Sequence, residues 1–507
     1  MKKKLFLTVG CLFALALAAA EADFSQIKSR ISEFTLANGL KFILFEDHSV
    51  PIVHFATYAN AGASDERIGI YGISHILEHL AFKGTSEIGT RNYPAEKKIL
   101  QRMAAVYDQV LAEKDQLRPD PAKIEKLQKE MDDLNKEAAA FVVDNEFGTI
   151  LKAHGAVGLN AGTSADATVY YYSLPANKLE LWAYLESSRF TDPVLREFYK
   201  EKDVIMEERR MGVENQPVGK LIEQFLSIAF MNHPYRVETI GPMSNLEHIT
   251  VRDVREYLRS NYSASNLVVG VAGDVTPSAL KKIAEKYFQK IPAGRKNPRV
   301  FTVDPGQGGE KTVTIYEDSQ PWLVLGYHVP SVLDADFDTF TVLNYLLTAG
   351  RSSRLFKKLT ITDKSALFIG SFAGFPGSKY PSLYLLYTLP NSGHDNNELQ
   401  KVIFEEIEKL KSQPVSDEEL RSAKNRIKVQ AFQELKSNQG LLQQLLSAEV
   451  LTGSWRQAFD SLANLDKITA ADIQKLTQKY LVRQNRAIGR IETQAEVQKW
   501  RRRLHWR

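Results

Sequence analysis

The chain has 507 residues, of which 44% are hydrophobic and 25% are charged, a balance typical of a soluble globular protein. This length exceeds what one hydrophobic core supports, so we expect two to four domains. The formal net charge is only +4, and nothing in it indicates nucleic acid as a partner.

The first 22 residues have the composition of a secretory signal peptide. Three lysines precede an apolar run, and Ala20-Glu21-Ala22 offers a cleavage site before Asp23. The run is shorter than the ~20 apolar residues of a spanning helix, which disfavours a membrane anchor. The only cysteine, Cys11, lies early in this run, which disfavours a lipid anchor. We therefore expect export to the periplasm or the cell exterior, and a mature chain without disulfides or thiolate metal ligands.

Two distant segments resemble each other. DVREYLRSNYSASNLVVGVAGDV begins at Asp253, and DIQKLTQKYLVRQNRAIGRIET begins at Asp472. Each predicts an amphipathic helix opened by Asp, then a polar turn and an apolar strand. Similar strands and helices precede both segments, so the sequence predicts two homologous α+β halves. The segment IPAGRKNPRVFTVDPGQGG, rich in Pro and Gly, is the expected linker between domains at 23–300 and 301–507.

The stretch from about Tyr93 to Asn145 differs from both halves. It is dense in Lys, Glu, Gln and Ala at helical spacing, and the sequence RPDP interrupts it at Arg118–Pro121. We predict an antiparallel helical hairpin inserted in the first domain, with Pro119 and Pro121 at its turn. The pattern leaves open whether the hairpin is a solvated structural element, a docking arm or a lid.

The stretch YGISHILEHLAFKGT contains His75, Glu78 and His79 in the order His-x-x-Glu-His. On a helix these residues fall within an arc of roughly 100°, and the apolar residues around them indicate a buried helix. Polar side chains in such a setting are costly unless something satisfies them. Two neutral histidines at i and i+4 can bind one zinc ion, which leaves Glu78 free to take a proton from water. Unrelated histidines on an ordinary helix are the alternative.

A catalytic zinc needs a third protein ligand, and the segment FYKEKDVIMEERRM offers one. Glu201 and Glu208 lie two helical turns apart and share a face, which Val204 and Ile205 would turn inward. Glu207 lies on a different side and is expected to meet solvent. One carboxylate could bind the metal while the other holds a ligand by a hydrogen bond. The spacing alone does not choose between them.

HILEHLAFKGT closely resembles the inverted zinc site of the pitrilysin/insulinase family of metallopeptidases, the inverzincins. GLNAGTSADATVYYYSLP, at Gly158–Pro175, resembles the substrate-facing strand of that family, and EKDVIMEERRM resembles its downstream glutamate helix. The resemblance implies Glu208 as the third ligand of one Zn²⁺ per chain and Glu201 as the carboxylate that orients a ligand. It also implies a peptide substrate bound as an added strand near Asn160 and Ala161. The implied domains each have a mostly antiparallel sheet flanked by helices.

Two features depart from the family pattern. The helical insertion separates the histidine pair from the downstream glutamate, although it can be looped out without moving the ligands. The second half of the family usually offers an Arg and, seven residues later, a Tyr, which hold the substrate carbonyl and backbone. Thr360 and Leu367 occupy those positions here, and neither can do that work. Arg351 and Arg354 are the nearest substitutes, unless they only cap the helix that follows.

The resemblance therefore implies a zinc-dependent endopeptidase in which Glu78 is the catalytic base. It also implies a homologous partner subunit that lacks the metal motif and supplies the Arg and Tyr, as in the mitochondrial processing peptidase and bacterial heterodimeric relatives. A homodimer is the less favoured assembly. The alternatives are a non-catalytic assembly or scaffold subunit of the same fold, and an exported binding protein whose hairpin docks a partner.

Overall fold

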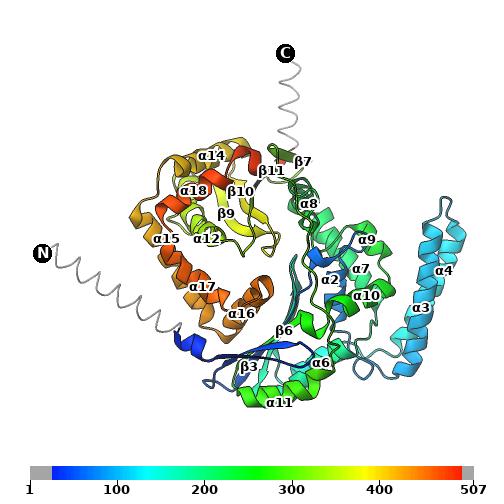
Figure 1. Ribbon diagram of the computed structural model, residues 1–507. Coiled ribbons are helices and arrows are strands. Elements are labelled where there is room, and N and C mark those ends of the chain that lie inside the picture. The colour runs from blue at the N-terminus through cyan, green and yellow to red at the C-terminus, as the bar shows by residue number, and fades with distance from the viewer. Residues whose placement is uncertain (1–24, 494–507) are drawn as a thin grey trace.

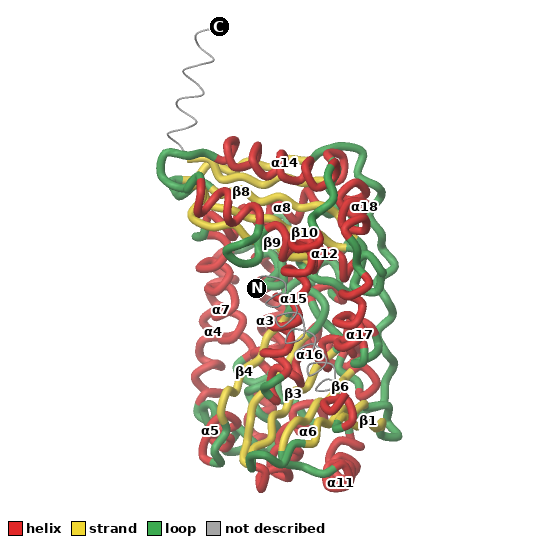
Figure 2. The backbone as a smooth tube through the Cα atoms, turned by 90° about the vertical axis from the view of Figure 1, so that its left-hand side faces the viewer, coloured by secondary structure: helices red, strands yellow, loops and turns green. Residues whose placement is uncertain are grey.

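The computed structural model describes residues 25–493, so the expected signal peptide lies outside the described part of the chain. Two β-sheets lie at opposite ends of the molecule with helices around them (Figures 1 and 2). Both are mostly antiparallel, so the predicted α+β fold with two similar halves is confirmed. No helix within residues 25–493 is long and apolar enough to cross a membrane.

The N-terminal sheet has six strands in the order β1-β2-β6-β3-β5-β4. Neighbouring strands are antiparallel except β2 and β6, which are parallel. β4 lies at one edge, so its outer backbone groups have no partner within the sheet. The strands are β1 (Ile31–Thr35), β2 (Lys41–Glu46), β3 (Ile52–Ala59), β4 (Val157–Thr163), β5 (Thr168–Pro175) and β6 (Leu267–Gly273).

The C-terminal sheet repeats this arrangement with five strands in the order β7-β11-β8-β10-β9. Its parallel pair, β7 and β11, corresponds to β2 and β6. The edge strand β9 corresponds to β4, so the two halves share one topology. The strands are β7 (Lys311–Glu317), β8 (Trp322–Val329), β9 (Ala366–Phe375), β10 (Ser382–Pro390) and β11 (Arg486–Thr493).

Helices flank both sheets. Those of the N-terminal half are α2 (Ile73–Leu80), α3 (Tyr93–Lys114), α4 (Pro121–Ala139), α5 (Glu146–Ala153), α6 (Leu179–Thr191), α7 (Phe198–Arg209), α8 (Pro217–Ala229), α9 (Met243–His248), α10 (Val251–Asn261) and α11 (Pro277–Tyr287). Those of the C-terminal half are α12 (Phe337–Leu347), α13 (Arg354–Phe356), α14 (Asn396–Ser412), α15 (Asp417–Leu435), α16 (Asn438–Thr452), α17 (Gln457–Asn464) and α18 (Ala470–Tyr480).

The two similar sequence segments fold alike. Each contains a helix, α10 or α18, followed by an inner strand of its sheet, β6 or β11. That strand belongs to the parallel pair of the sheet. Thr250 and Asp253 form a capping box at α10, and Thr469 and Asp472 do so at α18. Each helix therefore begins before the Asp that was predicted to open it. That Asp lies in the first turn, where its carboxylate accepts a hydrogen bond from the backbone N–H group of the capping Thr.

Each sheet is covered on one face by a helix from the other half. α8 packs on β7 and β11, where Leu221 and Phe225 enter the core of the C-terminal sheet. α16 packs on β3 and β6 of the N-terminal sheet through Leu442 and Leu446. Gly270 of β6 permits this approach, because a Cβ there would stand 2.5 Å from Leu442. The exchange of helices fixes the two halves against each other.

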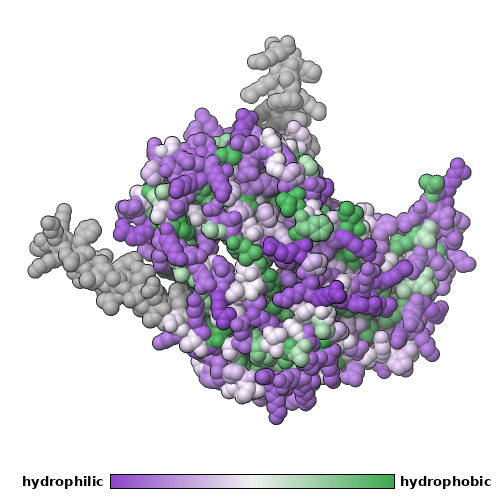
Figure 3. Space-filling model, viewed as in Figure 1, coloured by the Kyte–Doolittle hydropathy of each residue, from purple (hydrophilic) through white to green (hydrophobic). Residues whose placement is uncertain are grey.

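α3 and α4 form the predicted helical hairpin, which projects from the body of the molecule (Figure 1). Pro119 lies in its turn and Pro121 begins α4. Met103 and Met131 are among the apolar side chains buried between the two helices. The face of the molecule seen in Figure 3 is mainly hydrophilic. Leu117, in the turn of the hairpin, is a fully exposed hydrophobic residue.

Candidate metal centre

α2 carries His75, Glu78 and His79, and a buried carboxylate anchors its first turn. Glu66 accepts hydrogen bonds from the backbone N–H groups of Gly72 (2.7 Å) and Ser74 (2.8 Å). These bonds satisfy amides that a helix N-terminus leaves free. Gly72 has a φ of +95°, and the carbonyl oxygen of Ile240 would stand 2.5 Å from a Cβ there. Glycine at this position therefore lets α2 start against the core.

His75, His79 and Glu208 converge on one point, with one ligand atom of each within 4.8 Å of the others. The Nε2 atoms of His75 and His79 lie 3.7 and 3.8 Å from the same oxygen, Oε2 of Glu208. These distances are too long for hydrogen bonds. They are close to the ~3.4 Å between donors that a tetrahedral zinc ion with bonds of about 2.1 Å imposes. The three side chains therefore fit a zinc ion.

Glu201 holds the far side of the His79 ring. Its Oε2 lies 3.2 Å from Nδ1 of His79, and its Oε1 lies 2.6 Å from Nζ of Lys83. Burial would raise the pKa of Glu201, but His79 and Lys83 together lower it to about 2. The anionic carboxylate of Glu201 accepts a hydrogen bond from the protonated Nδ1 of His79. The lone pair on Nε2 of His79 is then directed toward Glu208. Within residues 25–493, no group forms a hydrogen bond with Nδ1 of His75.

The two histidines titrate differently. Burial, and then the charge of His79, lower the pKa of His75 to about 4. Burial would also lower the pKa of His79, but Glu201, Glu208 and Glu78 raise it above its ordinary value. His75 is therefore neutral near pH 7 and available to a metal ion, whereas a proton on His79 is the stronger competitor for the site.

Glu78 bonds to the end of the edge strand. The hydroxyl of Thr163, the last residue of β4, donates to Oε2 of Glu78 at 2.7 Å. Burial raises the pKa of Glu78, and the bond from Thr163 only partly offsets this rise. A raised pKa suits a carboxylate that takes up and releases a proton near neutral pH. Sequence patterns gave no signal for Thr163, because 85 residues separate it from Glu78.

α7 supplies both carboxylates. Glu201, Ile205 and Glu208 form the stripe that faces α2, and Ile205 is fully buried as expected. Val204 was predicted to face inward, but it is 40% exposed because it lies one position off this stripe. Glu207 is exposed, as predicted. The side chain of Glu208 is 43% exposed against 11% for Glu201, so the residue implied to bind the metal is the one that solvent reaches.

Asn160 and Ala161 lie on β4, three and two residues before the end of the strand at Thr163. The side chain of Asn160 donates to the hydroxyl of Tyr171 at 3.3 Å. The outer edge of β4 pairs with no strand among the described residues. Backbone N–H and C=O groups along it can therefore pair with an extended peptide beside Glu78.

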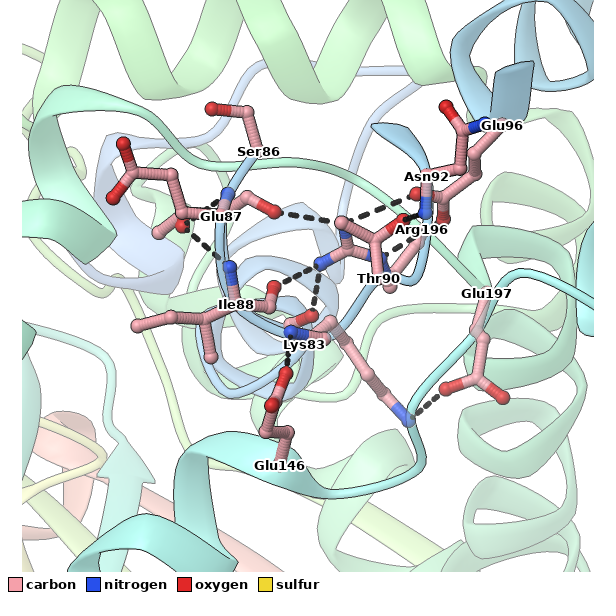
Figure 4. A network of polar contacts seen from close by, with 12 residues as sticks. Lys83, Ser86, Glu87, Ile88, Thr90, Asn92, Glu96, Glu146, Arg196 and Glu197 are labelled. Carbon is pink, nitrogen blue, oxygen red and sulfur yellow. Dashed lines mark hydrogen bonds and ion pairs between the residues drawn. The ribbon is translucent and has the colours of Figure 1, made fainter. Parts of the chain in front are cut away.

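Arg196 fastens the loop that follows α2 (Figure 4). Its buried guanidinium donates to the carbonyl oxygens of Lys83, Thr85 and Ile88. It also pairs with Glu96 of α3 at 2.9 Å. Glu197, the residue after Arg196, forms an ion pair with the Lys83 ammonium at 2.9 Å. The loop, the hairpin and α7 are thus tied together around the lysine that holds Glu201.

The C-terminal half supplies neither a cation nor a phenol at positions 360 and 367. The hydroxyl of Thr360 donates to a carbonyl of its own helical turn at 2.6 Å, and Leu367 is 53% exposed at the start of β9. Arg354 pairs with Glu419 at 2.6 Å, so it is held in the fold and is a poor substitute. Arg351 is exposed.

Comparison with known proteins finds the same family in both halves of the chain. The pattern of Insulinase (Peptidase family M16) matches residues 41–106, which include α2, and that of the Peptidase M16 inactive domain matches residues 248–427. The chain is similar to the insulinase family over these residues. It is 26% identical over 415 residues to the zinc protease PqqE of Helicobacter pylori, with 80% of each chain covered.

Two further relatives agree with this assignment. The probable mitochondrial-processing peptidase subunit beta of Arabidopsis thaliana is 21% identical, with 97% of this chain and 84% of the relative covered. The crystal structure of a protease from Helicobacter pylori matches with a TM-score of 0.74 at 23% identity, over 91% of this chain and 99% of that one. The resemblance inferred from HILEHLAFKGT and the expected fold are therefore confirmed.

Proposed function

We propose that this chain is a zinc-dependent endopeptidase that hydrolyses internal bonds of peptides or unfolded polypeptides. One observation carries the proposal: the Nε2 atoms of His75 and His79 lie 3.7 and 3.8 Å from one oxygen of Glu208. Glu78, with its raised pKa, lies between the two histidines on the same helix. A relative named as a zinc protease supports this reading.

The proposed chemistry divides the roles among four residues. His75, His79 and Glu208 would hold the ion and leave a fourth position open. When bound, zinc supplies Lewis-acid chemistry that polarises a carbonyl oxygen and acidifies a water molecule. Glu78 takes a proton from the attacking water and passes it to the leaving amine as the C–N bond breaks. Glu201 keeps the Nδ1 proton of His79 in place throughout.

The substrate would bind as an extra strand on the outer edge of β4, opposite Asn160 and Ala161. Support comes from the position of this edge, which ends at Thr163, the hydrogen-bond partner of Glu78. Backbone pairing accepts many sequences, so an extended peptide is the class of substrate that fits.

We further propose that a homologous partner subunit completes the active site. Thr360 and Leu367 provide no group that could bind the substrate carbonyl, and Arg354 is held by Glu419. One relative is named as subunit beta of a processing peptidase, a name that denotes one part of a larger enzyme. A heterodimer is therefore favoured over a homodimer. Residues 1–22 support export before assembly.

The test is to purify the exported chain alone and together with candidate homologous partners, and to measure zinc content and peptide hydrolysis. We expect one zinc ion per chain in both samples and hydrolysis only in the mixture. A chain that binds no zinc would support the non-catalytic scaffold alternative. Full activity of the isolated chain would remove the partner from the proposal.

A further inference from the structure

Asp166 lies in the turn between β4 and β5 and is only 4% exposed. Its Oδ2 accepts hydrogen bonds from the backbone N–H groups of Ser378 (2.7 Å) and Lys379 (3.0 Å). Its Oδ1 accepts another from the hydroxyl of Tyr235. Ser378 and Lys379 belong to the turn between β9 and β10 in the C-terminal half. One buried carboxylate therefore joins the two halves of the chain, and the proposed chemistry assigns it no role.

Two further contacts tighten this junction. The ammonium of Lys379 donates to the side-chain oxygen of Asn60, next to β3, at 2.7 Å. Gly377 lies so close that a Cβ there would stand 2.6 Å from Oδ2 of Asp166. A glycine is needed for that approach, so the C-terminal turn is shaped to receive this carboxylate. We call the contacts of Asp166 with Ser378, Lys379 and Tyr235 the clasp.

The turn that the clasp holds also carries the hydrogen-bond partner of Glu78. Thr163 lies three residues before Asp166 and donates to Glu78 at 2.7 Å. Between them, the hydroxyl of Ser164 accepts from the backbone amides of Asp166 (3.3 Å) and Ala167 (3.1 Å). These bonds make the turn one rigid unit, so a displacement at Asp166 is passed on to Thr163.

The N-terminal half also holds this turn, because the backbone N–H groups of Ala63 and Ser64 donate to the carbonyl oxygens of Ser164 (3.1 Å) and Ala165 (2.8 Å). Within the sheet, β4 has less support because it is an edge strand. Its only neighbour in the sheet is β5, and the pairing of the two strands shifts register between Val157 and Asn160. The far end of β4 is therefore the looser end. The position of Thr163 depends on the turn, which the bonds from Ala63 and Ser64 restrain at its backbone and the clasp restrains at Asp166.

We propose that Asp166 is a positioning residue: by fastening the turn between β4 and β5 to the C-terminal half, it presents the hydroxyl of Thr163 to Glu78. This inference rests on the proposed peptidase function. Ser378 and Lys379 fall within residues 248–427, the range matched by the Peptidase M16 inactive domain. That part of the chain thus shapes the active site without supplying a reacting group.

A double-mutant cycle tests the proposal in the complex that shows peptidase activity. Asp166→Asn and Thr163→Val are each expected to lower kcat about tenfold, with KM and zinc content nearly unchanged. The double variant should be no slower than either single variant, because both changes break one connection. Tyr235→Phe removes one bond of the clasp and should give a smaller effect of the same kind, which keeps the test available if Asp166→Asn does not fold.

Asp472→Asn is the matched control. Asp472 also accepts a hydrogen bond from a backbone N–H group, that of Thr469 (2.8 Å), but it does so at the start of α18 in the C-terminal half. We expect kcat of this variant to equal that of the wild type. Reductions in kcat by Asp166→Asn and Thr163→Val that multiply in the double variant would overturn the proposal, as would a folded Asp166→Asn variant with unchanged kcat.

Amide hydrogen exchange of the metal-free chain gives a readout that needs no activity. Exchange across residues 163–168 is expected to be faster in Asp166→Asn than in the wild type, and unchanged in Asp472→Asn. Unchanged exchange in Asp166→Asn would overturn the clasp. If the wild type cleaves no peptide, the proposed function fails on its own, and hydrogen exchange still decides whether Asp166 holds the turn.

Discussion

Replacing Glu201 by Gln should weaken zinc binding without removing a ligand. The pKa of Glu201 is about 2 in the fold against an ordinary value of 4.5, a difference that corresponds to about 3 kcal/mol in favour of the charged form. His79 and Lys83 provide that stabilisation, and a neutral amide forfeits most of it. Loss of such a carboxylate behind a histidine ligand typically costs 10–100-fold in metal affinity, or about 1.4–2.7 kcal/mol. We expect a loss within this range.

Competition with a chromophoric chelator at pH 7 measures this affinity directly. Glu207→Gln is the matched control, because Glu207 lies on the same helix but is exposed and pairs with Arg210. Its zinc affinity should stay within about twofold of the wild type, as is usual for surface charges. A Glu201→Gln variant that binds zinc as tightly as the Glu207→Gln variant would refute the assigned role of Glu201.

The same carboxylate makes stability depend on pH in a defined direction. Because the pKa of Glu201 is lowered in the fold, its stabilising interactions are complete above the ordinary pKa of 4.5. They are lost progressively as the pH falls toward 2. The acid unfolding of the metal-free Glu201→Gln variant should therefore depend less steeply on pH in this range than that of the wild type.

Three further predictions follow from the site and the fold. Glu78→Gln should retain one zinc ion per chain and lose turnover, measured by metal analysis and peptide hydrolysis; near-native activity would remove Glu78 from the chemistry. Zinc affinity should fall as the pH is lowered through the raised pKa of His79, well before His75 titrates near pH 4, and chelator competition that shows no loss above pH 4 would contradict this order. Phe225→Ala should cost about 3–5 kcal/mol of unfolding free energy, because the fully buried ring carries α8 into the C-terminal sheet; a loss below 1 kcal/mol in urea unfolding would show that α8 is not needed there.

Local sequence patterns were sufficient to predict the centre of the site. His75, Glu78 and His79 lie within two turns of one helix, so helical geometry alone places them on one face. The seven-residue spacing of Glu201 and Glu208 placed both on the face of α7 that meets α2. Which of the two approaches the histidine nitrogens depends on the crossing of α2 and α7, and spacing within one helix contains no information about that crossing.

The parts that the sequence did not predict are contacts between distant segments. Thr163 and Glu78 are 85 residues apart, and Asp166 and Ser378 are 212 apart. No periodicity reports such pairs. The exchange of helices was also unforeseen, because the apolar face of α8 requires a sheet to cover but does not specify which one. Val204 was placed wrongly because an apolar residue one position from a buried stripe looks the same in sequence as one within it.

X-ray absorption at the zinc edge of the purified protein tests the central claim most directly. We expect one zinc ion per chain with two imidazole nitrogens and a carboxylate oxygen at about 2.0–2.2 Å, and loss of the carboxylate contribution in Glu208→Gln. A spectrum without imidazole scattering, or one that Glu208→Gln leaves unchanged, would contradict the assignment of His75, His79 and Glu208 as the ligands.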